Sequence, residues 1–106
     1  MPKKYNVQVS SAAYNKLYQH SRFLARVSVP AAERLYADFN EAGKFLENHP
    51  ESCPQYITLI STDANLKYKL FGDKNRYRIV FEIIGNIVFA YDIQDCRQGT
   101  DKSLID

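Results

Sequence analysis

Three strand-like segments lie in the second half of the chain. The first two alternate between apolar and polar residues, and this period of two constrains the fold more than any other feature. The segments are residues 66–71, 76–84 and 87–93. A period of two places successive side chains on opposite faces of a β-sheet. Gly85 and Asn86 separate the last two segments, as the residues of a two-residue hairpin turn do. We therefore expect three consecutive antiparallel strands, with a first turn at residues 72–75.

The first half of the chain changes to a helical period after a short opening strand. Residues 5–10 alternate, as a half-buried strand does. In residues 11–26 and 30–48, apolar residues recur every three or four positions, which is typical of amphipathic helices. Ser10 or Ser11 is expected to cap the first helix, and Ser28 the second. The predicted order of elements is β-α-α-β-β-β.

This order predicts an α+β fold in which an antiparallel sheet is covered on one face by an N-terminal helical hairpin. A chain of 106 residues is enough for one domain, which we expect to span residues 1–106. The last strand is apolar on both sides: Ile87, Phe89, Tyr91 and Ile93 on one, Val88 and Ala90 on the other. Such a strand is either central and covered on both faces or part of a surface that binds a partner.

Composition excludes several classes of protein. Hydrophobic residues make up 45% of the chain and charged residues 25%, which is typical of a folded domain. No apolar run approaches the ~20 residues of a membrane span, and the N-terminus does not resemble a signal peptide, so we expect a cytoplasmic protein with no membrane partner. The four glycines are isolated, and His20 and His49 lack a metal-like spacing to each other or to the two cysteines. No metal or cofactor is expected.

The net charge of +2 conceals a local excess of bases. Five bases lie between residues 67 and 78, where Asp73 is the single acid: Lys67, Lys69, Lys74, Arg76 and Arg78. One interpretation is a solvated strand edge protected by lysines. The other is a site that holds phosphates, because a local cationic group binds them even when the whole protein is nearly neutral.

In the second interpretation, an antiparallel meander brings four bases around one concavity: Lys67, Lys69, Arg78 and Arg97. Arginine binds phosphate oxygens bidentately, and lysine acts as a point charge or, with a lowered pKa, as a base. Such a group suits backbone phosphate binding or RNA cleavage by the neighbouring 2′-hydroxyl. Lys74 and Arg76 are then expected to bind the RNA beside it.

The sequence around these bases resembles the RelE/ParE toxin superfamily. The resemblance rests on Lys67-Tyr68-Lys69-Leu70, on Arg-Tyr-Arg-Ile-Val-Phe-Glu-Ile at residues 76–83, on residues 87–93 followed by Arg97, and on the element order. It covers nearly the whole chain. It implies a small toxin of a type II toxin–antitoxin module, of the plasmid stabilisation kind. A short cognate antitoxin would wrap the toxin and repress their shared operon.

The RelE branch of the superfamily implies an enzyme, an endoribonuclease that cleaves mRNA in the ribosomal A site, with ribosome and mRNA as partners. By this resemblance, Lys67 or Lys69 would assist removal of the 2′-hydroxyl proton, while Arg78 and Arg97 would stabilise charge on the phosphate. The RelE pattern continues to a C-terminal tyrosine, or histidine in related toxins. Residues 98–106 contain neither, which leaves the general acid unassigned.

Two other functions fit the same resemblance. The ParE branch implies an inhibitor that binds DNA gyrase and cuts no RNA. A catalytically inactive relative that only binds an antitoxin is the third possibility.

Overall fold

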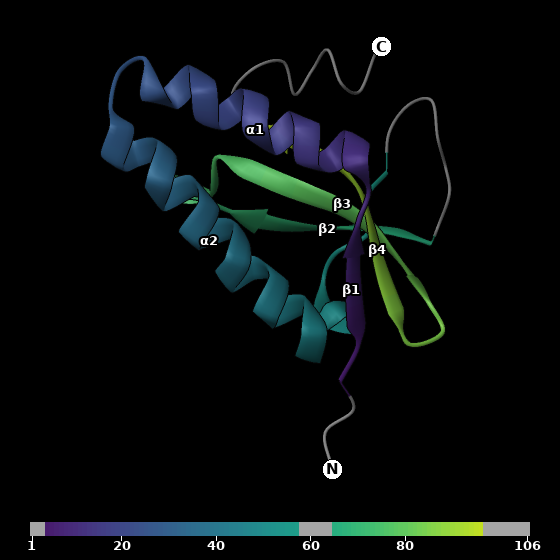
Figure 1. The fold of residues 1–106 in the computed structure, drawn as a ribbon. Helices are drawn as coiled ribbons and strands as arrows, with labels where there is room; N and C mark the ends of the chain where they lie inside the picture. Colours follow the sequence, from purple (N-terminus) through teal and green to yellow (C-terminus); the bar gives the residue numbers. More distant parts are fainter. Residues whose placement is uncertain (1–3, 58–64, 97–106) are drawn as a thin grey trace.

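The computed structural model describes residues 4–57 and 65–96, and it contains the predicted elements in the predicted order (Figure 1). They are β1 (Asn6–Val9), α1 (Ser11–Ala25), α2 (Val29–Asn48), β2 (Leu66–Phe71), β3 (Tyr77–Ile84) and β4 (Ile87–Asp95). Two short 3₁₀ turns, η1 (Pro50–Ser52) and η2 (Asp73–Asn75), complete the order. The predicted α+β fold is confirmed. None of the helices in the described part of the chain is both long and apolar enough to cross a membrane.

The four strands form one sheet in the order β1-β4-β3-β2. β2 with β3 and β3 with β4 are antiparallel, as predicted, but β1 runs parallel to β4, so the sheet is mixed and not wholly antiparallel. The reason is the long separation of β1 and β4 in sequence. Antiparallel neighbours are joined by short turns, whereas strands with a helical connection between them are free to pair in parallel.

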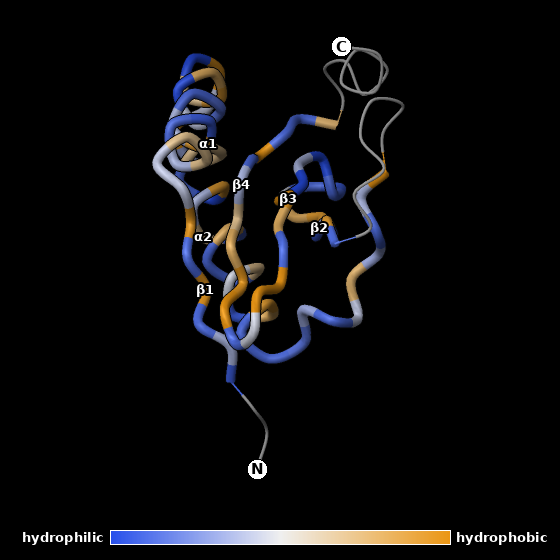
Figure 2. The backbone as a smooth tube through the Cα atoms, turned by 90° about the vertical axis from the view of Figure 1, so that its right-hand side faces the viewer, coloured by the Kyte–Doolittle hydropathy of each residue, from blue (hydrophilic) through white to orange (hydrophobic). Residues whose placement is uncertain are grey.

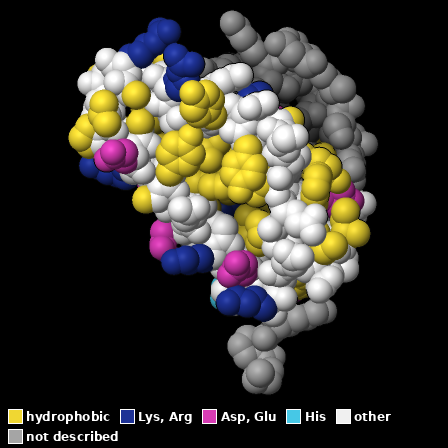
Figure 3. Space-filling model, in the orientation of Figure 1, with side chains coloured by type: hydrophobic (Ala, Val, Ile, Leu, Met, Phe, Trp, Pro, Cys, Tyr) yellow, Lys and Arg dark blue, Asp and Glu magenta, His cyan; other side chains and the backbone are white. Residues whose placement is uncertain are grey.

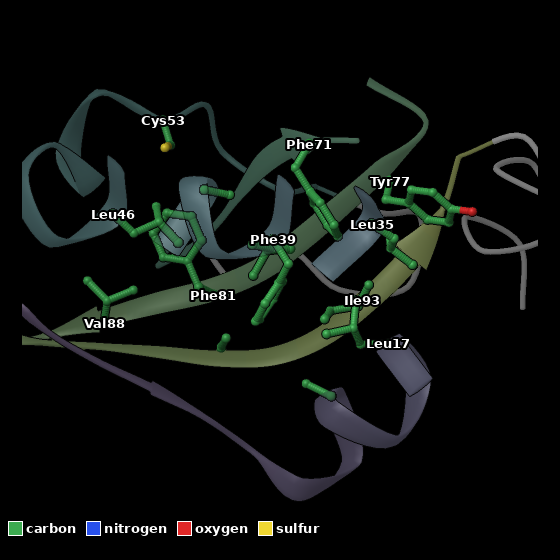
Figure 4. Packing of buried hydrophobic residues seen from close by; sticks show 14 of the residues in the cluster. Leu17, Leu35, Phe39, Leu46, Cys53, Phe71, Tyr77, Phe81, Val88 and Ile93 are labelled. Atoms are coloured by element: carbon green, nitrogen blue, oxygen red, sulfur yellow. The ribbon is translucent and has the colours of Figure 1, made fainter. Parts of the chain in front are cut away.

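Both helices lie on one side of the sheet (Figures 1 and 2). We call the covered side the inner face and the opposite side the outer face. The core between helices and inner face includes Leu17 of α1 and Leu35, Phe39 and Leu46 of α2, which pack on side chains such as Phe81 (Figure 4). The apolar stripes read from the sequence are therefore the surfaces that fold onto the sheet.

Serine side chains fix where the helices begin. The Ser10 hydroxyl accepts a hydrogen bond from the amide of Ala13 at 3.0 Å, and the Ser28 hydroxyl accepts one from Ala31 at 3.2 Å. Each satisfies an amide that lacks a partner in the first helical turn. Both caps agree with the sequence prediction.

A β-bulge changes the predicted faces of β4. Val80 pairs with Asp92, but its neighbour Phe81 pairs with Ala90, so Tyr91 is an extra residue without an opposite partner. The extra residue shifts the alternation by one position. Ile93 is consequently buried on the inner face beside Ala90, and the prediction that it shares a face with Tyr91 was wrong.

His20 of α1 lies half-buried against the end of β4. Its Nε2 atom is 3.4 Å from the carbonyl oxygen of Ile93, and its ring centroid is 5.2 Å from that of Tyr77. Burial lowers the pKa of His20, and Lys16 and Arg76 act in the same direction. The Ile93 carbonyl and Asp95 oppose the shift without cancelling it. The fold therefore favours the neutral imidazole.

We expect this histidine to make the protein less stable in mild acid. Because the pKa of His20 is lower when folded, the unfolded chain binds more protons, so the free energy of unfolding falls as the pH drops below about 6.5. His20→Gln retains a donor for the Ile93 carbonyl but does not titrate, and it should flatten the decline. Urea unfolding between pH 7.5 and 5.5 measures both proteins. An equal decline in the variant would contradict the assignment.

Two glycines should respond oppositely to replacement by alanine. Gly72, before η2, has φ of +86°, and a Cβ atom there would lie 2.8 Å from Cδ2 of Tyr77. Gly72→Ala should cost about 1–3 kcal/mol of stability. Gly43 lies inside α2 with open space around the Cβ position, so Gly43→Ala should add about 0.5–1 kcal/mol. Urea unfolding checks both, and a stabilising Gly72→Ala would contradict this reading of the turn.

Candidate functional site

The structure places three of the predicted catalytic bases, Lys67, Lys69 and Arg78, on two different faces of the sheet. Lys67 pairs with Phe81 and Lys69 with Ile79, so both lysines share the inner face with core residues. Arg78 pairs with Leu70 on β2, which puts it on the outer face. Lys67, Lys69 and Arg78 therefore do not share one concavity, because the register of β2 and β3 separates the two lysines from Arg78.

The two lysines stay at the edge of the inner face. The Lys67 ammonium donates a 3.1 Å hydrogen bond to the carbonyl oxygen of Cys53, in the segment that follows η1. The Lys69 ammonium lies 4.5 Å from the centroid of the Phe45 ring on α2, a cation–π distance. Both side chains thus bridge β2 to neighbouring elements, where they contribute to packing.

Arg78 is enclosed by aromatic and polar side chains on the outer face. Its Nε atom donates a 2.7 Å hydrogen bond to Oε1 of Gln94 on β4. Its Cζ atom lies 5.1 Å from the ring centroid of Tyr56 and 5.9 Å from that of Tyr68. The two rings are themselves edge to face, with centroids 6.4 Å apart. We call Arg78, Tyr56, Tyr68 and Gln94 the arginine cage.

One nitrogen in the arginine cage lacks a hydrogen-bond partner among the described residues. The Nη2 atom of Arg78 is buried, and it makes no hydrogen bond to the described residues. A buried charged donor without an acceptor is costly, by at least about 1–3 kcal/mol. A carboxylate or phosphate oxygen is the group that would satisfy it. The cage is therefore the best candidate anion site on the outer face.

A chain of hydrogen bonds holds the arginine cage from the side of α1. The Gln94 amide nitrogen donates to the hydroxyl of Tyr56 at 3.0 Å and to Oδ2 of Asp92 at 3.2 Å. Oδ1 of Asp92 lies 3.1 Å from the ammonium of Lys16. Gln94 thereby orients the guanidinium, and sequence reasoning missed it. The alternation of side chains along β2 and β4 could have identified it, because Gln94 and Tyr68 fall on the same face as Arg78 once the strand register is known.

Arg76 forms an ion pair with Asp95. Its guanidinium donates to both oxygens of the buried Asp95 carboxylate, with a shortest distance of 2.8 Å. Hydrogen bonding to Asp95 raises the pKa of Arg76. The pair joins the start of β3 to the end of β4. By contrast, Lys74 is exposed on η2, where it has φ of 56°.

The remaining predicted site residue, Arg97, lies outside the described residues. Within residues 4–57 and 65–96, no group of three or more His, Cys, Asp or Glu side chains is arranged to hold a metal ion. Cys53 and Cys96 are free thiols, and burial raises the pKa of both.

Replacement of Arg76 should reveal a structural role. Arg76→Ala removes the ion pair that Arg76 makes with the buried Asp95 carboxylate, and we expect a loss of about 3–5 kcal/mol of stability. Lys74→Ala, at an exposed base nearby, is the matched control and should stay within about 0.5 kcal/mol of the original protein. Thermal and urea unfolding measure both. Equal stability of the two variants would leave Arg76 available for binding RNA.

Comparison with known proteins supports the fold. No protein-family model matches the sequence, and no curated protein matches it either. Among solved structures, the chain is similar to one titled "Chromosomal ParDE TA system from P. aeruginosa", with a TM-score of 0.70 and 13% sequence identity. The match covers 88% of this chain and 97% of that chain. The RelE/ParE-like fold implied by the sequence resemblance is therefore confirmed.

Proposed function

We propose that this chain is the toxin of a type II toxin–antitoxin pair and that a cognate antitoxin neutralises it. The support is the fold shared with a chain of the ParDE toxin–antitoxin structure over 88% of this chain. The motifs on β2, β3 and β4 that resemble the RelE/ParE superfamily lie in that same fold. A sequence identity of 13% does not identify the target of the toxin, so the geometry of the site has to indicate it.

The division of the bases between two faces favours a toxin that binds a protein over one that cuts RNA. Cleavage by the predicted mechanism requires a lysine and arginines within hydrogen-bonding distance of one phosphate. Lys69 contacts Phe45 on the inner face, whereas Arg78 lies in the cage on the outer face. We therefore place the ParE-like mode first, with DNA gyrase as the target that the resemblance implies.

The chemistry of the outer face fits a protein target. Beyond the arginine cage, the tip of the β3–β4 hairpin presents exposed Ile84 and, further along β4, exposed Tyr91. The ring of Phe89 packs edge to face against that of Tyr91 at 4.8 Å. Exposed apolar side chains on the sheet that also carries the half-buried Arg78 suit a protein surface with an acidic residue better than a polyphosphate backbone.

Two assays on the purified chain distinguish the modes. We expect inhibition of DNA supercoiling by gyrase and no new mRNA ends in a translating extract. Arg78→Ala should weaken the inhibition by about tenfold or more, since it removes the guanidinium whose buried Nη2 lacks a hydrogen-bond partner among the described residues. Lys69→Ala, on the inner face, is the matched control and should inhibit nearly as well as the original protein.

Other outcomes identify the alternatives. Ribosome-dependent mRNA cuts that disappear in both Lys69→Ala and Arg78→Ala would establish the ribonuclease and overturn the ParE-like mode. Absence of both activities, together with harmless overexpression in a bacterial host, would leave a relative that only binds an antitoxin.

A further inference from the structure

The helical hairpin divides the charge of the chain between its two helices. Residues 1–32 contain five Lys and Arg residues and no Asp or Glu, so all 12 acids lie between residues 33 and 106. α2, which packs on the same sheet as α1, has four acids and two bases. In Figure 3, Lys and Arg side chains stand at the top of the view, over α1, and acidic side chains lie lower, along α2. One helix is therefore basic and the other acidic.

The stability of α1 as a helix does not explain its lack of acids. The dipole of a helix favours Asp or Glu in the first turn and Lys or Arg in the last turn. α1 has Arg22 in its last turn and Arg26 as its C-cap, but its first turn contains no acid. It also lacks the Glu–Lys pairs four residues apart that stabilise exposed helices. The charge of α1 is thus free of acids even where the helix itself would favour them.

The exposed side of α1 is a stripe of guanidinium, amide and phenol groups. The opposite side of the helix, with Ala13 and Leu17, is buried in the core. We call the exposed residues opposite the core the α1 stripe; they are Asn15, Tyr18, Gln19, Arg22 and Arg26. Arginine, asparagine and glutamine are side chains that bind the phosphates and base edges of DNA. The stripe contains such donors along its length and no acid that would repel a polyanion.

Two arginines of the α1 stripe lie one helical turn apart. Arg22 and Arg26 are exposed, and neither forms an ion pair with an acid of the described residues. Like charges four residues apart on a helix repel each other, and a phosphate between them would remove this repulsion. An open hollow of about 670 Å³, bordered by both arginines and by Gln19 and Phe23, provides the space. The pair is therefore suited to a phosphate.

Charge and shape together select duplex DNA as the partner. α1 has 15 residues, which corresponds to a length of about 22 Å. The major groove of B-DNA, about 12 Å wide, accepts a helix, whereas the deep, narrow major groove of duplex RNA does not. We propose that the α1 stripe binds duplex DNA, with Arg22 and Arg26 on phosphates of the backbone. This inference concerns the chain alone and goes beyond the proposed function.

An anionic membrane suits the same surface less well. Helices that lie on a membrane turn an apolar face to the lipid, but the apolar face of α1 forms part of the core. Three exposed apolar side chains, Phe23, Val27 and Val29, lie at or beside the turn between the helices. Along the helix, the α1 stripe would present mainly polar groups to the lipid.

The position of α1 allows DNA and a protein to bind at the same time. α1 lies on the inner side of the sheet, whereas the arginine cage is on the outer face (Figure 2). If the target is a protein that itself holds DNA, as the proposed function implies, binding through one surface raises the effective concentration at the other. A weak contact of α1 with DNA then adds to the affinity for such a target.

Fluorescence anisotropy with a labelled DNA duplex of about 20 base pairs tests the proposal on the full chain. Two phosphate contacts predict an affinity that falls about tenfold between 50 and 200 mM salt. Arg22→Gln removes one contact, so the fall should shrink to about threefold, and binding at the lower salt should weaken by about fivefold. Lys44→Gln, at an exposed base of α2, changes the net charge equally and is the matched control. It should retain the tenfold fall.

Other results of the same assay would overturn the proposal. Equal salt dependence in Arg22→Gln and Lys44→Gln, or no binding of the original chain at 50 mM salt, would exclude the α1 stripe as the site. Tighter binding of single-stranded DNA, of duplex RNA or of phosphatidylglycerol vesicles would exclude duplex DNA as the partner. Circular dichroism and urea unfolding establish that both variants are folded.

The assay is independent of the proposed function because it contains neither gyrase nor an antitoxin. A chain that binds the duplex in this way but does not inhibit gyrase would contradict the ParE-like mode and leave this inference standing. A chain that inhibits gyrase but does not bind the duplex would have the opposite meaning.

Discussion

Burial of Ile79 and Phe81 beneath the helical hairpin decides the chemistry of both faces of this sheet. These side chains must point inward to form the core with Leu17 and Phe39. In the observed register their partners on β2 are Lys69 and Lys67, so the demand for an apolar core also takes both lysines to the inner face. Arg78, one residue from Ile79, is turned outward by the same alternation. A slip of one residue between β2 and β3 would reverse the face of every β2 side chain relative to β3.

The inner face tolerates the two lysines because β2 is an edge strand. Aliphatic stems cover apolar surface there while the ammonium groups reach the Cys53 carbonyl and the Phe45 ring. The pairing of Gln55 with Lys67 also extends the sheet beyond β2, so this edge is covered by the chain itself. The resulting arrangement uses the lysines to join β2 to the preceding segment and to α2. Arg78 remains on the outer face, enclosed by the arginine cage.

Local patterns in the sequence were sufficient to predict the elements. The period of two predicted β2 and β3, and the apolar run after the Gly85-Asn86 turn predicted β4. The helical period predicted α1 and α2, and Ser10 and Ser28 were recognised as caps. These features are set by neighbouring residues, and a single sequence contains them.

Relations between distant segments were not predictable in the same way. The parallel pairing of β1 with β4 and the bulge at Tyr91 depend on how whole strands align, which no local pattern records. For the same reason the candidate site was only partly predicted. Arg78 was identified from its charge and its strand. Its contact with Gln94 spans 16 residues of the chain, and the contact of Gln94 with Tyr56 spans 38.

Because β1 is shorter than β4, this edge of the sheet consists of β1 along one half and of β4 along the other. β1 ends at Val9 opposite Ala90, while β4 continues to Asp95, so the last part of β4 has no strand neighbour on that side within the described residues. There the bulge at Tyr91 and the Lys16–Asp92 ion pair disturb the flat, uncharged edge that another strand would need. This half of the edge is protected against sheet-to-sheet aggregation. On this side of the sheet, the edge that another strand could pair with is therefore limited to the four residues of β1.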